Sequence, residues 1–63
     1  MTQAEIIRWA ISGIKVKRTA FFEGYLEYKQ SKPEVASALM KVLMEMNTKQ
    51  EELEAMLAKE EEQ

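Results

Sequence analysis

Apolar residues recur at helical spacing through the first half of the chain. They occupy Ile7, Ala10, Ile11, Ile14, Phe21, Tyr25 and Tyr28, at intervals that place them on one side of a helix. Thr2 and Glu5 have the spacing of a capping box, in which the Thr2 hydroxyl accepts a hydrogen bond from the Glu5 amide. The pattern therefore predicts a helix over residues 3–30.

A second helix start lies at residues 31–34. We expect Ser31 to cap this helix, with Glu34 completing the box and Pro33 in the first turn, where a missing amide costs nothing. Pro33 also disfavours helical backbone at Lys32, so the first helix ends nearby. The second helix is predicted over residues 32–61, and a break at Asn47 is the alternative. Its apolar stripe is Val35, Leu39, Val42, Leu43, Met46, Leu53, Met56 and Leu57.

Antiparallel pairing about this turn brings the two stripes into register. Tyr28 then faces Val35, and Ile11 faces Leu53. Arg18 comes level with Glu45, and we expect its guanidinium near that carboxylate. With no sustained two-residue alternation to suggest strands, the sequence predicts an all-α, antiparallel two-helix hairpin. We expect one domain over residues 1–63, with an acidic tail that frays at about residues 60–63.

Size and composition indicate that this hairpin needs a further stabiliser. The chain has 63 residues and neither Cys nor His, which excludes disulfides and thiolate metal sites. Chains this short commonly depend on disulfides, metals or oligomerisation for stability. Oligomerisation is the remaining choice.

A row of small residues in the first helix suggests where a second copy packs. The row consists of Ala10, Gly13, Ala20 and Gly24, with Lys17 at its middle position. Each mid-helix glycine costs about 1 kcal/mol relative to alanine, and small side chains let another backbone approach closely. We expect a homodimer, a four-helix bundle, with this row at its interface. The alternatives are glycines tolerated on the surface or a kink at Ser12-Gly13.

Several large apolar residues lie outside the two stripes. They are Trp9, Phe22, Leu26, Met40 and Met44, and Trp, Phe and Met are common in binding surfaces. We expect this set to bind another protein. The alternative is that the same residues form the core of the dimer.

Charge is divided unevenly between the two halves of the chain. Residues 1–31 hold five basic and three acidic groups (+2), whereas residues 32–63 hold four basic and eight acidic groups (−4). The simplest interpretation is attraction between the two helices. A second interpretation is that basic groups of the first helix bind the backbone of RNA or DNA while the ring of Phe22 stacks on a base. These groups are Arg8, Lys15, Arg18 and Lys29.

Other functional classes find little support in the sequence. Ser12, Ser31 and Ser37 have no histidine to activate them, every acidic residue is Glu, and no phosphate-binding loop or metal-ligand spacing occurs. We expect no enzymatic activity, cofactor or metal. Apolar stretches are far shorter than the ~20 residues of a membrane span, and no signal peptide is readable, so we expect a cytoplasmic protein.

The expected function is that of a small helical adaptor, inhibitor or assembly subunit. Such a protein acts as a homo-oligomer by binding another protein, and its size suits a regulator encoded by a phage, a plasmid or a bacterium. An RNA- or DNA-binding regulator is the alternative.

Overall fold

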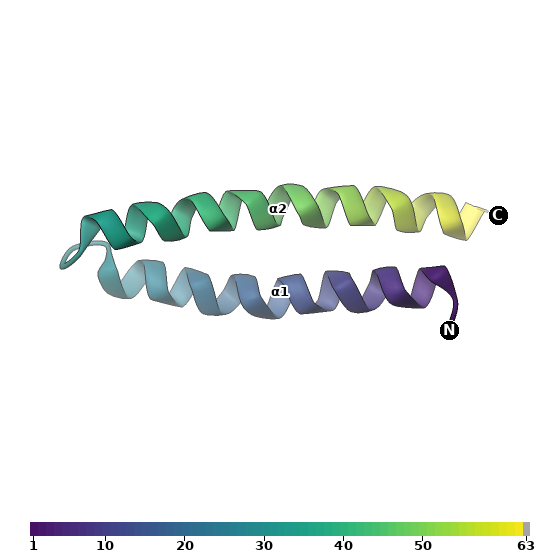
Figure 1. Cartoon of the computed structure of the whole chain (residues 1–63), viewed down its shortest axis with the longest axis horizontal. Helices are drawn as coiled ribbons and strands as arrows, with labels where there is room; N and C mark the ends of the chain where they lie inside the picture. Colours follow the sequence, from purple (N-terminus) through teal and green to yellow (C-terminus); the bar gives the residue numbers. More distant parts are fainter. Residues whose placement is uncertain (63) are drawn as a thin grey trace.

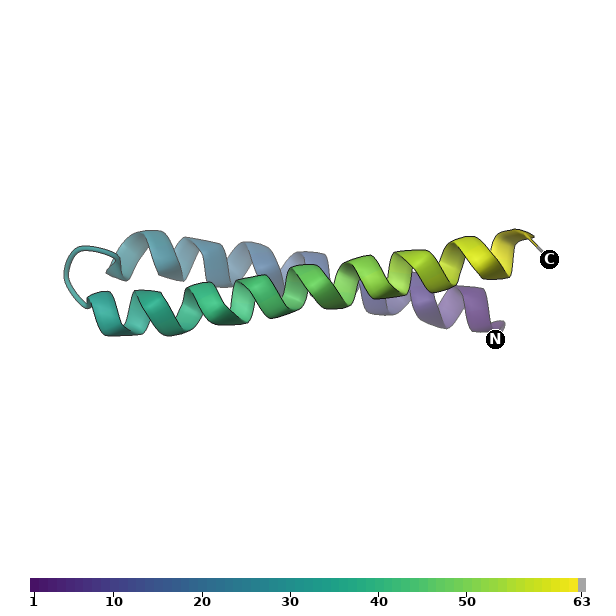
Figure 2. The ribbon, with the colours of Figure 1, turned by 90° about the horizontal axis from the view of Figure 1, so that it is seen from above.

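A computed structural model describes residues 1–62 and shows two helices and no strand among them. Helix α1 spans Gln3–Tyr28 and helix α2 spans Pro33–Glu62. The helices run antiparallel, with both chain ends at one end of the molecule and the turn at the other (Figure 1). Seen from above, they cross at a shallow angle (Figure 2). The predicted all-α hairpin is confirmed.

The start of α1 is fixed by the predicted cap. Thr2 has extended backbone geometry, and its hydroxyl accepts a hydrogen bond from the Glu5 amide at 3.2 Å. The same hydroxyl donates to the Glu5 carboxylate at 3.4 Å. Thr2 thus satisfies one of the amides that a helix N-terminus leaves without an intrahelical partner.

The turn differs from the prediction in its details. The Lys32 carbonyl accepts hydrogen bonds from the Val35 and Ala36 amides at 3.0 and 3.1 Å, which makes Lys32 the N-cap of α2 in place of Ser31. The reason is that Pro33 has its φ fixed near the helical value and suits the first helical position, whereas the residue before a proline avoids that geometry. Helix α1 ends at Tyr28, two residues earlier than predicted.

Helix α2 is continuous, so the alternative of a break at Asn47 is wrong. The polar side chains of this stretch find partners along the helix itself: the Thr48 hydroxyl donates to the Met44 carbonyl at 3.2 Å, and the Asn47 amide to the Glu51 carboxylate at 3.4 Å. The helix also continues to Glu62, and the fraying expected from about residue 60 stays a prediction. Residue 63 lies outside the described part of the chain.

The contact between the helices follows a regular three-and-four repeat. The repeat comprises Ala4, Ile7, Ile11, Ile14, Arg18, Phe21, Tyr25 and Tyr28 on α1, and Ala36, Leu39, Leu43, Met46, Gln50, Leu53, Leu57 and Glu60 on α2. Each of these residues is buried or half-buried. Such a seven-residue period is typical of a coiled-coil seam. The hairpin is therefore a short antiparallel coiled coil.

Two polar residues occupy this seam at mid-length. Arg18 Nη1 donates to Gln50 Oε1 at 2.6 Å and to Asn47 Oδ1 at 3.5 Å. The predicted contact of Arg18 with Glu45 is wrong, and Glu45 is exposed. Helical side chains lean toward the N-terminus of their own helix. In an antiparallel pair this direction leads from Arg18 toward Gln50, the C-terminal side of α2.

The hairpin buries little apolar surface. Only Ile7, Ile11, Ala36 and Leu43 are buried among residues 1–62, and none of them completely. The Cα radius of gyration is 14.6 Å, against about 11 Å for a compact domain of this length. The accessible surface is 4928 Å², against about 4200 Å² for a compact monomer of this mass. Neither described helix combines the length and apolar character needed to cross a membrane.

Candidate interaction surface

The hairpin has two broad faces, one on each side of the seam. Helical geometry assigns every residue beside the seam to one of them. The groove face carries Lys15, Thr19, Phe22, Leu26 and Lys29 of α1 and Ser37, Met40, Met44, Asn47, Glu51 and Glu54 of α2. The small-residue face carries Ala10, Gly13, Lys17, Ala20 and Gly24 of α1 and Val35, Val42, Glu45, Lys49, Glu52 and Met56 of α2. The predicted dimer row and most of the predicted binding residues thus lie on opposite sides of the molecule.

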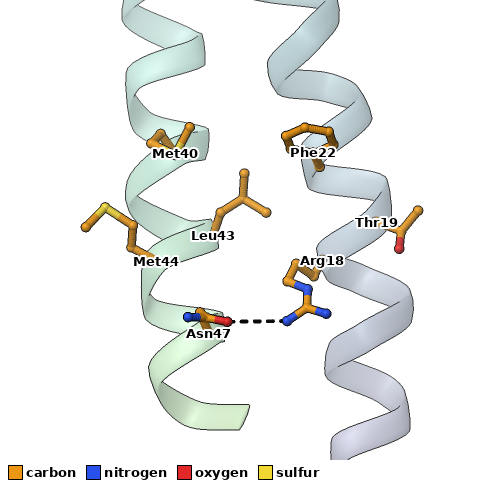
Figure 3. A pocket seen from close by; sticks show the side chains of 7 residues that line it. All are labelled: Arg18, Thr19, Phe22, Met40, Leu43, Met44 and Asn47. Carbon is orange, nitrogen blue, oxygen red and sulfur yellow. Dashed lines mark hydrogen bonds between the residues drawn. The ribbon is translucent and has the colours of Figure 1, made fainter. Parts of the chain in front are cut away.

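A shallow apolar groove of about 470 Å³ gives the groove face its name. Phe22 of α1 and Met40 of α2 stand on its two sides, and Leu43 projects between the helices (Figure 3). Met44 and Thr19 lie at its outer edges, and Arg18 with Asn47 closes one end. The groove is therefore an apolar surface with a polar end that is tied to the seam.

The apolar surface continues toward the turn. A second hollow of about 350 Å³ shares Met40 with the groove and is lined further along by Tyr25 and Pro33, with Lys29 and Lys41 also among its lining residues. The ring of Phe22 stacks with that of Tyr25, with 6.2 Å between centroids. Because Tyr25 belongs to the seam, this stacking holds Phe22 at the wall of the groove. The turn half of the groove face thus combines aromatic and methionine side chains with Lys29 and Lys41.

Three of the five residues predicted to bind a partner meet in this groove. Phe22, Met40 and Met44 line it, and Phe22 and Met44 are 48% and 65% exposed. Leu26 is one turn from Phe22 and is also exposed. Trp9 is separate, because it lies roughly 20 Å from Phe22 along α1 at about 1.5 Å per residue. The predicted binding set is therefore a four-residue patch and a distant tryptophan.

The two glycines of the small-residue row have different surroundings. A Cβ built on Gly24 would lie 3.4 Å from Leu39 Cδ1, whereas one built on Gly13 would meet nothing within 4 Å. Packing inside the hairpin therefore explains Gly24 in part and leaves Gly13 without an intramolecular reason. Both have ordinary helical backbone, since no residue described has a positive φ. Helix α1 is continuous through Ser12-Gly13.

The predicted basic residues are divided among different environments. Arg8 Nη2 pairs with Glu61 Oε1 at 2.9 Å, and Arg18 reaches across the seam to Gln50. Lys15 and Lys29 are exposed on the groove face. The α2 half of the same groove face carries carboxylates. The predicted basic residues therefore do not form one uniform cationic surface.

The predicted binding set lacked four residues that line the groove: Thr19 and Asn47, together with Leu43, which was predicted for the core stripe, and Arg18, which was predicted as a nucleic-acid residue. The available signal was the three-and-four repeat, which places Leu43 in the seam and Thr19 and Asn47 directly beside it. As for metals, residues 1–62 contain no cluster of three or more His, Cys, Asp or Glu side chains with suitable geometry.

Comparison with protein-family models, with curated proteins and with solved structures finds no match to this chain. Its function is therefore argued from the geometry of these two faces.

Proposed function

We propose that this chain is a small non-enzymatic interaction protein that acts as a homo-oligomer by binding protein through its groove face. Its role is that of an adaptor, an inhibitor or an assembly subunit, and the assembled form is a four-helix bundle made of two hairpins.

The observation that carries this proposal is the mismatch between what the hairpin buries and what it exposes. Four apolar side chains are buried, whereas eight large apolar side chains are about half exposed or more. They are Met1, Ile6, Trp9, Val16, Phe22, Leu26, Met44 and Met56. Phe22 and Met44 are gathered at one groove. Contiguous exposed apolar surface, such as the groove with Phe22, Met44 and the neighbouring Leu26, is typical of protein interaction sites.

The groove also has the composition of a protein interface. Its centre is aromatic and methionine-rich, two classes that interfaces favour because they bury large areas or adapt to a partner's shape. Charged residues lie toward the edges of the face, as in the polar rim of an interface. No part of this description requires a reaction, a cofactor or a metal.

Nucleic-acid binding is the alternative function. Lys15 and Lys29 flank Phe22 at seven-residue intervals, which allows phosphate contacts on either side of a stacked base. Against it, Arg8 is paired with Glu61, Arg18 points into the seam, and α2 contributes carboxylates to the same face. These carboxylates would repel a phosphate backbone.

A capture experiment tests the protein-binding proposal. The tagged chain is immobilised and exposed to an extract of the cells that express it, and retained proteins are identified by mass spectrometry. Phe22→Ala and Met44→Ala should reduce retention strongly, with helix content by circular dichroism unchanged. Val16→Ala is the matched control, because Val16 is an exposed apolar residue of α1 outside the groove. Equal retention by wild type, Phe22→Ala and Met44→Ala would refute the proposal.

A further inference from the structure

We infer that the groove face is covered by a second copy of this chain, with the two turns at the same end of the dimer. This inference rests on the proposed function and names the occupant of the same face. It replaces the small-residue row as the interface, because nothing besides that row points to a partner there.

The size of the face suits a stable dimer. The Cα trace extends 49 × 16 Å across the hairpin and 11 Å through it. To bury the ~800 Å² per partner that typical specific interfaces bury, two copies would have to pack along most of this length. Two such slabs packed face to face form a four-helix bundle with an apolar interior. This packing would cover Phe22, Leu26 and Met44, and it would leave Met56 exposed on the small-residue face.

Charge on the groove face is sorted by helix. The α1 side carries Lys15, Lys29 and Arg8, the last of which already pairs with Glu61 of the same chain, and Glu5 is its one acidic residue near the N-terminus. The α2 side carries Glu51, Glu54 and Glu61, and its one basic residue is Lys41, at the hollow near the turn. A surface with one basic and one acidic half is complementary to itself when a two-fold axis places unlike halves together.

Only one orientation brings the unlike halves together. If the two-fold axis runs parallel to the helices, α1 of one copy packs on α2 of the other, and both turns lie at the same end. If the axis runs across the helices in the plane of the face, α1 packs on α1 and α2 on α2, and the turns lie at opposite ends. The second arrangement opposes like charges on both sides, so the first is favoured.

The favoured orientation also matches the levels of the side chains. Because a two-fold axis parallel to the helices preserves height along the bundle, Phe22 of one copy lies level with the Met40–Met44 turn of the other. Lys15 lies near the level of Glu51, and each leans toward the other, for the same reason that Arg18 reaches Gln50 within one chain. Apolar groups thus meet apolar groups toward the turn, and opposite charges meet nearer the termini.

A pair of matched variants identifies the face. Met44→Glu places a carboxylate in the proposed interface, whereas Gly13→Glu places one on the opposite face, where a side chain meets open space. Sedimentation equilibrium of the purified chain should give twice 7.3 kDa for wild type and for Gly13→Glu. Met44→Glu should raise the dimer Kd about tenfold or more, because it buries an unpaired carboxylate. Dimers unaffected by Met44→Glu but dissociated by Gly13→Glu would overturn the inference in favour of the small-residue row.

Mixing two charge variants tests the contact between copies. Lys15→Glu alone opposes Glu to Glu twice in the symmetric dimer, and Glu51→Lys alone opposes Lys to Lys twice, so each should raise Kd about tenfold. An equimolar mixture should recover dimers of near wild-type affinity, since both Lys–Glu contacts are restored in the heterodimer. A contact within one chain gives no such recovery. A mixture that associates no better than either variant alone would contradict the inference.

These outcomes separate the inference from the function it rests on. A monomeric purified chain that still captures a foreign protein through Phe22 would refute the self-association and leave protein binding at the groove intact. A dimer whose Kd is unchanged by Met44→Glu, Lys15→Glu and Glu51→Lys would refute the inferred interface, although the chain would still be a homo-oligomer.

Discussion

Arg18 Nη1 donates to Gln50 Oε1 at 2.6 Å across the seam of the hairpin. Both residues occupy positions where the three-and-four repeat otherwise places apolar side chains. A polar pair inside an apolar seam aligns the two helices, because sliding either helix by one turn would leave the guanidinium beside apolar groups. We expect this half-buried pair to set the register of the hairpin, as polar residues in the seam do in other coiled coils.

The energetic coupling of Arg18 and Gln50 is measurable by a double-mutant cycle. Arg18→Ala and Gln50→Ala should show a coupling of about 1–2 kcal/mol in the free energy of unfolding, as expected for a partly exposed hydrogen bond to a charged donor. Chemical denaturation at one fixed protein concentration provides the values. Glu45→Ala is the control and should show almost no coupling to Arg18→Ala. Stronger coupling to Glu45 than to Gln50 would contradict the observed pairing.

The two glycines of α1 should respond differently to alanine. Gly13→Ala should stabilise the hairpin by about 1 kcal/mol, because the added methyl group meets open space and the helix propensity improves. Gly24→Ala should gain less, since its methyl group would press on Leu39 Cδ1 at 3.4 Å. Thermal unfolding of the two variants beside wild type checks this order. Destabilisation by Gly13→Ala would show that the small-residue face is closely packed in the assembled protein.

Removing a threonine hydroxyl should change the stability of the hairpin differently at the cap of α1 and in the interior of α2. Thr2→Ala removes the side chain that caps α1 and should cost about 1 kcal/mol. Thr48→Ala removes a hydroxyl that donates to the Met44 carbonyl one turn back, a bond that adds little to a helix. It should be neutral or slightly stabilising, because alanine is the better helix former. Denaturant midpoints of the two variants decide, and equal losses would contradict the assignment of Thr2 as the cap.

Salt dependence distinguishes the groove face from a nucleic-acid site. Fluorescence titration with a generic single-stranded RNA should show no binding at physiological salt, because Arg8 and Arg18 are engaged and α2 is acidic. Binding that weakens steeply with salt and is lost in Lys15→Glu would instead establish the nucleic-acid function.

The hairpin is predictable from sequence for identifiable reasons. Two apolar stripes of helical period flank Pro33, and a proline at the start of the second stripe leaves few alternatives to a turn. The antiparallel register alone does not predict the partner of Arg18. Register places Arg18 beside Glu45, but helical side chains point toward the N-terminus of their own helix, which moves the contact to Gln50. The cap at Lys32 is missed for a related reason: Ser31 has the better capping side chain, but the fixed φ of Pro33 decides the position.

The candidate site is predictable only in part. The one-turn spacing of Phe22 with Leu26 and of Met40 with Met44 gives two short apolar ridges, and their meeting requires the register of the hairpin. Trp9 resembles these residues in type but lies too far along α1 to join them. The sorting of charge onto the two sides of the groove face becomes visible only when both helices are placed.

The distance between the two turns in solution tests the self-associated groove face most directly. The chain has no cysteine, so Ser31→Cys in the turn accepts a single spin label whose separation within the dimer pulsed electron paramagnetic resonance can measure. Turns at the same end predict a distance below about 30 Å, since they are separated by no more than two helix diameters of ~10–12 Å and the label arms. A distance near the 49 Å length of the hairpin, or no dipolar coupling at all, would contradict it.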